Sequence, residues 1–309
     1  MLMTPPPLPS TASDADLERL ARLADSALRI EARLTPKPGL VDARNAGAHG
    51  DMDLHTLYVS AQALAPWWVT FATCGSLHVD AHDAELLTAL RRIGRAAEDA
   101  MFTATGGINT HKGAVFAFGL LLGCAGRRLG SGRGVDVGVC DDVAALATPL
   151  LVDDLVTSAR EPVTAGELLY RAHGLTGARG QAASGYATAR DVGLVAYREA
   201  LELLAAQPHL ALGPMARDRA LLHALLALLA VNNDTNLAHR GGPEAMTRVA
   251  ARADGLLRLG GALNPHYVRL IEAFDDELTD AGLSPGGTAD LLAVTIWLSA
   301  LPPASHLHH

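Results

Sequence analysis

Apolar residues recur along this chain at the three- and four-residue spacing that places them on one face of a helix. The first such run, Leu17, Leu20, Ala24 and Leu28, predicts a helix that begins at Asp14. Alanine and leucine dominate these runs, whereas the alternating β-branched residues typical of strands are nearly absent. The same pattern predicts ten further helices, near residues 53–72, 83–103, 111–125, 140–159, 164–172, 187–206, 214–231, 243–259, 264–281 and 286–300.

These helices predict an all-α fold, a single compact multi-helix catalytic domain over residues 14–301. The Pro- and Ser-rich residues 1–13 predict a flexible N-terminal tail, and residues 302–309 predict a C-terminal tail. The only stretch with strand character is "VDVGV" at residues 135–139. Short segments rich in Gly, Pro and Asn separate the helices, and no linker or internal repeat divides the chain.

Charge and composition argue against several classes of function. The chain of 309 residues has a formal net charge of −8, which disfavours nucleic acid or an anionic membrane as the main partner. Its longest apolar runs, "GAVFAFGLLLGCAG" and "ALLHALLALLAV", are too short to span a bilayer and predict buried helices. Cys74, Cys124 and Cys140 are odd in number and show no CxxC spacing, so we expect reduced thiols and a cytoplasmic protein.

Lysine and asparagine are concentrated in the polar segments between the helices. Of the 25 basic residues, only Lys37 and Lys112 are lysines, and five of the six asparagines lie in these segments. In a sequence biased towards arginine and alanine, residues that persist in so few places are interpreted as ones that could not be replaced. We therefore expect both lysines to be point charges at a phosphate or metal site, where the larger guanidinium of arginine would not fit.

The segment "TGGINTHKG" leads into one of the apolar helices. Thr110 is a candidate N-cap, and Gly113 allows a ligand to approach the backbone closely. A helix N-terminus exposes unpaired N–H groups and the positive end of the dipole, which favours phosphate binding. Lys112 would add a positive charge, and Asn109 and His111 would add hydrogen-bonding groups. The spacing is not that of a P-loop, and a plain glycine turn before a core helix is the alternative.

Three carboxylates, Asp42, Asp51 and Asp53, follow Lys37 in the segment "LTPKPGLVDARNAGAHGDMDLHT". One or two carboxylates together with substrate phosphates are the usual way in which proteins hold Mg²⁺. The predicted metal ligands are therefore Asp51 and Asp53, joined by Asp234 from a later segment. The alternative is a solvated acidic first turn that opposes the helix dipole.

Polar clusters also stand at the ends of two further apolar helices. In "NNDTNLAHRGG" an apolar helix runs into a dense polar cluster, which must be satisfied by a ligand, an ion or a loop-capping network. The segment "HGLTGARG" places an arginine in a glycine-rich turn suited to bidentate phosphate binding, and "LSPGG" opens another apolar helix. These segments add Arg179, Asp234, Asn236, His239, Arg240, Gly286 and Gly287 to the candidate site.

Six motifs in order, "TPKPGLVD", "GAHGDMD", "GGINTHKGAVF", "HGLTGARG", "DTNLAHRGG" and "LSPGGTADLLA", closely resemble those of the triphosphoribosyl-dephospho-CoA synthases of the CitG/MdcB type. The resemblance covers roughly residues 16–300. It implies an enzyme that acts on ATP and 3′-dephospho-CoA, releases adenine and joins the triphosphoribosyl group to the ribose 2′-hydroxyl. It also implies an α-linked product, hence a single displacement that inverts C1′. The product would pass to an acyl-carrier-protein holo-transferase and serve malonate decarboxylase or citrate lyase, of which we favour the former.

The implied reaction suggests a role for each candidate residue. The transition state should resemble an oxocarbenium ion, so a base is needed for the acceptor hydroxyl and a proton donor for adenine. Candidate catalytic residues are Asp42, Asp53 and Asp234 as the base and His111 and His239 as the donor. Candidate substrate-binding residues, acting with Mg²⁺, are Lys37, Asn109, Thr110, Lys112, Gly113, Arg179, Asn236, Arg240, Gly286 and Gly287. The chain departs from the family motif at Gln181, where glutamate is common, so Gln181 is not expected to be the base.

Two other functions stay open at this point. A helical ATP-dependent phosphoryl transferase or nucleotide hydrolase would produce ADP in place of free adenine. A non-catalytic helical protein that binds the acyl carrier would not turn over ATP, and it would leave the placement of lysine and asparagine unexplained. The sequence also leaves open whether the protein is a homodimer and in which order the substrates bind.

Overall fold

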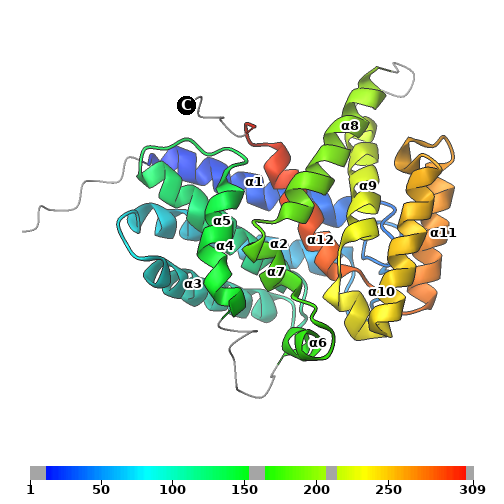
Figure 1. Cartoon of the computed structure of the whole chain (residues 1–309), viewed down its shortest axis with the longest axis horizontal. Coiled ribbons are helices and arrows are strands. Elements are labelled where there is room, and N and C mark those ends of the chain that lie inside the picture. Colours follow the sequence, from blue (N-terminus) through cyan, green and yellow to red (C-terminus); the bar gives the residue numbers. More distant parts are fainter. Residues whose placement is uncertain (1–11, 153–163, 207–213, 304–309) are drawn as a thin grey trace, which may run out of the picture.

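The computed structural model describes residues 12–152, 164–206 and 214–303, and these residues are helical without a strand (Figure 1). The helices are α1 (Asp14–Arg33), α2 (Leu54–Leu77), α3 (Asp83–Ala104), α4 (Lys112–Gly130), α5 (Val139–Leu151), α6 (Ala165–His173), α7 (Gly177–Ala183), α8 (Leu194–Ala205), α9 (Pro214–Val231), α10 (Thr235–Arg258), α11 (Tyr267–Asp280) and α12 (Gly286–Ser299). A π-helical turn, Thr188–Gly193, precedes α8, and a 3₁₀ turn, Gly261–Leu263, follows α10. The predicted all-α fold is confirmed.

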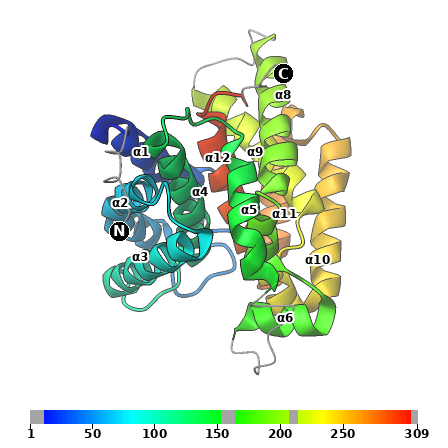
Figure 2. The same cartoon turned by 60° about the vertical axis from the view of Figure 1, so that its left-hand side comes forward.

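The helices form two groups that meet at α12. Figure 2 shows α1 to α4 on one side and α8 to α11 on the other, with α12 between them. The contacts agree, because α12 packs against α1 and α4 as well as against α9 and α10. Its residues are therefore buried on every face from Leu291 to Leu298, which explains a sequence with no polar stripe.

Helices α2 and α4 approach each other closely in the core because glycines line their contact. A Cβ atom at Gly126 would lie 1.8 Å from the carbonyl oxygen of Ala72, so no side chain fits there. Aromatic rings then join three helices, because Phe118 packs edge-on against Trp68 at 5.6 Å and Trp297 at 6.4 Å between ring centroids. This core fixes the start of α4 relative to the start of α12.

Helix α4 is long and apolar enough to cross a membrane by length and composition alone. Within this fold it is the central core helix, since 72% of its apolar window is buried inside the protein.

The three cysteines are free and buried, and burial raises the pKa of Cys124 and Cys140 to about 12.

Several element boundaries differ from the predicted ones. Residues 135–139 form no strand, and α7 replaces the glycine-rich turn that was expected. Helix α10 begins eight residues before the predicted 243, but its backbone is non-helical at Gly242 (φ 77°, ψ 170°), so the predicted start at 243 coincides with the second of its two helical segments. Part of the predicted helix over 140–159 and most of both predicted tails lie outside the described residues.

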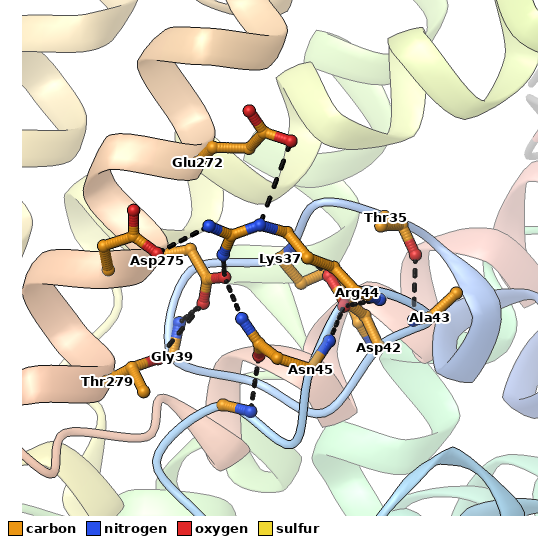
Figure 3. A network of polar contacts seen from close by, with 12 residues as sticks. Thr35, Lys37, Gly39, Asp42, Ala43, Arg44, Asn45, Glu272, Asp275 and Thr279 are labelled. Carbon is orange, nitrogen blue, oxygen red and sulfur yellow. Dashed lines mark hydrogen bonds and ion pairs between the residues drawn. The ribbon is translucent and has the colours of Figure 1, made fainter.

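The loop between α1 and α2 is held against α11 by a polar network (Figure 3). The buried carboxylate of Asp275 accepts hydrogen bonds from the Gly39 amide at 2.9 Å and the Asn45 side chain at 2.8 Å, and it pairs with Arg44. Arg44 also contacts Asp276 at 2.6 Å. The loop therefore forms a fixed wall for the space next to it.

Candidate active site

A pocket of about 1090 Å³ lies where both groups of helices meet. Its walls come from the end of α1, the α1–α2 loop, one face of α3, and the first residues of α4, α7, α10 and α12. All six polar motifs found in the sequence place residues on it, although they are spread over some 250 positions, from Lys37 to Gly287. The tertiary fold thus gathers these separate polar segments in one place.

The starts of three long helices face this pocket. Lys112 and Gly113 open α4, Asn236 lies in the first turn of α10, and Gly286 and Gly287 open α12, and all of them line the pocket. Each helix start carries partial positive charge, and Asp234 and Asp290 already accept hydrogen bonds from some of the first-turn amides. Their convergence makes this region of the pocket favourable for a multiply charged anion such as a triphosphate.

Asp234 joins the starts of α10 and α12 and is almost completely buried. One carboxylate oxygen caps α10 by accepting from the amides of Asn236 at 2.9 Å and Leu237 at 3.4 Å. The other accepts from the amide and the hydroxyl of Thr288, both at 2.7 Å. Burial raises the pKa of Asp234, and the Thr288 hydrogen bonds oppose that shift. With four donors bound, this carboxylate is a structural junction.

Asp290 belongs to α12, and its side chain reaches the start of α4. There it accepts a hydrogen bond from the Ala114 amide, and its Oδ2 fills the space beside Gly113. A Cβ atom at Gly113 would lie 1.8 Å from that oxygen, so any side chain at position 113 would displace the Asp290 carboxylate. Burial raises the pKa of Asp290 well above its usual value, and the nearby carboxylates of Glu31 and Asp234 raise it further. Asp290 is therefore a pocket-lining carboxyl group whose pKa is shifted upwards.

Lys37 lines the pocket with only 1% of its surface exposed. Its ammonium donates to the Glu31 carboxylate at 2.6 Å and to the Glu31 carbonyl oxygen at 2.7 Å. This ion pair lies in the pocket wall. The Glu31 carboxylate is close enough to raise the pKa of Asp290, and the Lys37 ammonium is close enough to lower the pKa of His111. Lys37 thus lies where the sequence predicts a site lysine, but its ammonium is already engaged.

His111 stands at the N-cap of α4 and is 4% exposed. Its Nδ1 lies 2.7 Å from the Ser60 hydroxyl, which accepts a hydrogen bond from Thr110 at 2.6 Å. Ser60 can then donate its own proton to Nδ1, which leaves the imidazole proton on Nε2. Burial, followed by the charge of Lys37, lowers the pKa of His111 to about 3, so the ring is neutral near pH 7. Nε2 has no hydrogen-bond partner among the described residues.

Two more buried polar atoms beside the pocket lack partners in the described chain, the Gln181 Oε1 and the Tyr186 hydroxyl. A chain of hydrogen bonds orients Gln181, because Asn232 Nδ2 donates to the Thr288 hydroxyl and its Oδ1 must then accept from Gln181 Nε2 at 3.1 Å. Gln181 is left with an acceptor, and Tyr186, whose pKa is raised by burial, with a donor. Buried polar atoms of this kind indicate a missing ligand.

The structure places most of the predicted site residues at this pocket. All ten predicted substrate-binding residues line it, as do His111, Asp51 and Asp234. Three predicted residues do not line it, namely Asp42, Asp53 and His239. Their positions in the sequence indicate the correct part of the fold. The direction of each side chain depends on local hydrogen bonds, which the spacing of residues does not reveal.

The two aspartates outside the pocket are occupied by their own backbone. Asp42 is buried and accepts from the amides of Lys37 and Arg44, both at 2.7 Å, and of Asn45 at 3.2 Å, which folds the α1–α2 loop. Asp53 is exposed and forms a capping box with Thr56 at the start of α2. His239 lies exposed on α10. Neither aspartate is therefore placed to act as the base.

The predicted metal ligands do not form a cluster. Among the residues that the structure describes, no group of three or more His, Cys, Asp or Glu side chains could hold a metal ion. Asp234 is saturated and Asp53 lies away from the pocket, which leaves Asp51 as the exposed carboxylate of the predicted trio on the rim.

Sequence reasoning missed several residues of the site. Neither Tyr186 nor Asp290 was among the predicted site residues. On α3, Arg91 and Arg95 line the pocket one turn apart. The signal for the arginines was their shared helical face, and for Asp290 a carboxylate within an otherwise apolar helix.

Comparisons with known proteins find similar sequences over most of the chain. The family model described as CitG, ATP:dephospho-CoA triphosphoribosyl transferase, matches residues 17–308. A 2-(5′′-triphosphoribosyl)-3′-dephosphocoenzyme-A synthase of Klebsiella pneumoniae is 42% identical over 286 residues, which cover 92% of this chain and 91% of the relative. A probable synthase of the same name from Albidiferax ferrireducens is 46% identical over 293 residues, covering 94% and 93%. No solved structure matches the chain.

Proposed function

This chain belongs to the family of ATP:dephospho-CoA triphosphoribosyl transferases, and on that premise we propose how its pocket performs the transfer. As a member of the family it is an enzyme that acts on ATP and dephospho-CoA. The proposal rests on the unpaired polar atoms of His111, Gln181 and Tyr186. They line the same pocket as Asp290, whose carboxyl pKa is raised by burial. In this reaction the bond from C1′ of ATP to adenine breaks, and a bond from C1′ to the acceptor oxygen forms.

The triphosphate of ATP binds at the starts of α4, α10 and α12. The helix dipoles and the first-turn amides that Asp234 and Asp290 do not occupy favour anions, and Lys112 at 53% side-chain exposure can reach a bound phosphate. Arg179 and Arg240 line the same pocket and supply further positive charge. Gly286 and Gly287 line the pocket without side chains. The phosphates can therefore approach the backbone there.

Asp290 is the general base that takes the proton from the acceptor hydroxyl. Its raised pKa makes it a stronger base than an ordinary carboxylate, and a single backbone hydrogen bond leaves it with acceptor capacity. Asp234 is less suitable because four donors already bind it. The negative charge of Asp290 also lies where it can stabilise the positive charge that develops on the ribose.

His111 assists the departure of adenine. Its neutral ring, with the proton on Nε2, is a hydrogen-bond donor to a ring nitrogen of the leaving base. The hydroxyl proton moves to Asp290 and the leaving adenine takes up a proton, so the overall reaction transfers one proton from acceptor to adenine. Gln181 and Tyr186 provide an acceptor and a donor that hold the substrates in register for this exchange.

Mg²⁺ is proposed as the partner of the triphosphate. The described residues offer no cage of three ligands, which fits an ion carried mainly by substrate phosphates. Asp51 on the rim would be its protein ligand, and the ion would neutralise part of the triphosphate charge.

We place the reaction in the cytoplasm, in keeping with three buried free thiols. We also propose that the product is handed to an acyl-carrier-protein holo-transferase and supplies malonate decarboxylase. These two statements go beyond the family assignment, and the genes adjacent to this one would test the second.

The reaction is tested by incubating the protein with ATP, Mg²⁺ and 3′-dephospho-CoA and separating the products by chromatography with mass detection. We expect one adenine released per acceptor consumed, an α-linked product, and neither ADP nor pyrophosphate. The variant His239→Ala serves as a control, because His239 lies outside the pocket and its loss should leave the rate unchanged. ADP as the main product would support a phosphoryl transferase instead.

A further inference from the structure

Helix α3 presents to the pocket a face that the proposed chemistry does not use. The residues of this helix that line the pocket are Leu87, Leu90, Arg91, Gly94, Arg95 and Glu98. They recur at helical spacing and therefore form one continuous strip along α3. We call this strip the α3 face.

Gly94 interrupts the buried stripe of α3 at the pocket. The stripe consists of Leu86, Leu90, Ala97 and Met101, and Gly94 falls between Leu90 and Ala97 on the same side. A Cβ atom added at Gly94 would meet no protein atom within 4 Å. Glycine is unfavourable within a helix, and packing does not require it here, so the open space next to Gly94 belongs to the pocket.

The charges around Gly94 favour an anionic ligand. Arg91 and Arg95 are both exposed on the pocket rim, and Arg95 forms no hydrogen bond or ion pair with the described residues. Lys112 lies across the rim at 3.3 Å from Glu98. Lys112 and Glu98 form a pair and Arg91 has an interaction of its own, so Arg95 is the side chain that adds an uncompensated positive charge to this part of the pocket.

We propose that the α3 face binds the pyrophosphate group of 3′-dephospho-CoA. Arg95 and Arg91 contact the phosphates, and the absence of a side chain at Gly94 lets the ligand lie against the helix backbone. This inference rests on the proposed function, because it assigns the second substrate of that reaction to a particular wall of the same pocket.

The acceptor fits this wall better than ATP does. The helix starts of α4, α10 and α12 already provide a site for the triphosphate, whereas the arginines of α3 stand at the exposed rim. Dephospho-CoA carries a long pantetheine arm that must extend beyond its pyrophosphate, so its phosphates belong at a rim. A pocket of about 1090 Å³ is also larger than the roughly 300–1,000 Å³ usual for one small ligand.

Two matched pairs of variants test the proposal by calorimetric titration with each substrate alone and by the KM for each substrate in turnover. Arg95→Ala is paired with Arg92→Ala, which removes the same charge from the neighbouring position that does not line the pocket. Gly94→Ala is paired with Gly255→Ala, a helical glycine of α10 with equally open space but away from the pocket. Gly94→Ala and Gly255→Ala should each raise the melting temperature by about 1–2 °C.

For Arg95→Ala we expect the dissociation constant and the KM of dephospho-CoA to rise by about tenfold or more while those of ATP change little. Gly94→Ala should weaken dephospho-CoA severalfold despite its higher melting temperature, and both control variants should bind it like the wild type. Equal effects of Arg95→Ala and Arg92→Ala, or a loss confined to ATP, would overturn the inference.

Failure of the proposed function has a different signature. A wild-type protein that binds both substrates but releases no adenine refutes the reaction, and the binding data for the α3 face still decide the inference. An active wild type whose Arg95→Ala variant binds and uses dephospho-CoA normally refutes only the inference.

Discussion

Two buried aspartates of the pocket, Asp234 and Asp290, should respond in opposite ways to the same substitution. Asp234→Asn places an amide nitrogen next to the Thr288 amide and hydroxyl, which now donate to the Asp234 carboxylate. A buried donor left without its acceptor costs about 1–3 kcal/mol, so the loss should total about 2–4 kcal/mol. For a chain of 309 residues that lowers the melting temperature by roughly 3–6 °C.

Asp290→Asn retains the acceptor for the Ala114 amide and removes only the buried charge. Because the pKa of Asp290 is raised in the folded protein, its ionisation opposes folding, and that penalty begins as the pH rises above the ordinary value of 3.8. The penalty grows until the pH reaches the folded pKa. The variant lacks it, so its melting temperature should equal or exceed that of the wild type, with a gap that widens as the pH increases.

The Asp290→Asn substitution should abolish activity although it does not reduce stability. Loss of a general base lowers kcat by about 10²–10⁴-fold, so Asp290→Asn should be nearly inactive in adenine release while fully folded. Thermal melting by circular dichroism between about pH 5 and 8 and a chromatographic adenine assay measure the two effects. Asp290→Asn with near-normal turnover would remove Asp290 as the base, and a melting temperature as low as that of Asp234→Asn would show that its charge is not destabilising.

Three further predictions concern the lysines and the metal. Lys37→Met should destabilise the protein by about 3–5 kcal/mol in chemical unfolding by leaving Glu31 buried and unpaired, and adding Glu31→Leu should restore stability; no recovery in the double variant would contradict the paired-charge explanation. Lys112→Ala should lower kcat/KM by at least about tenfold, equivalent to about 1.4 kcal/mol, with an unchanged melting temperature. Lys112→Arg should retain more activity than Lys112→Ala, because the exposed site has room for a guanidinium. Equal losses of activity in the two variants would show that the shape of the side chain matters more than its charge. Activity should disappear in excess chelator and return with added Mg²⁺, so full turnover in chelator would exclude the proposed metal.

The sequence predicts the helices well because most of them carry a regular apolar stripe. Its boundaries are least accurate where glycine has a local role, since Gly242 interrupts the helical backbone of α10 and the helical segment before it, residues 235–241, was not predicted. The short helix α7 has no stripe at all, and it forms because its neighbours hold it. Such tertiary effects on a seven-residue segment leave no periodic signal.

The sequence also predicts the position of the site better than the work of its residues. Lys37 and Lys112 share a rare residue type and reach one pocket, yet one is buried in an ion pair and the other lies on the rim. Composition reveals that both positions are unusual, but burial decides whether a charge is available. The same limit applies to Asp42, whose neighbours along the chain bind both its oxygens.

The pocket departs from good packing in a way that favours turnover over stability. Asp290 lies near Glu31 and Asp234, and three buried polar atoms around them have no partner in the described chain. Each of these features opposes folding, yet the aromatic and glycine-lined core of α2, α4 and α12 holds them in place. A bound substrate supplies the missing partners, and the neutral ring of His111 gains an acceptor for its Nε2 proton only when the adenine of ATP is in place. The hydrogen bond that assists the departure of adenine is therefore tied to a filled site.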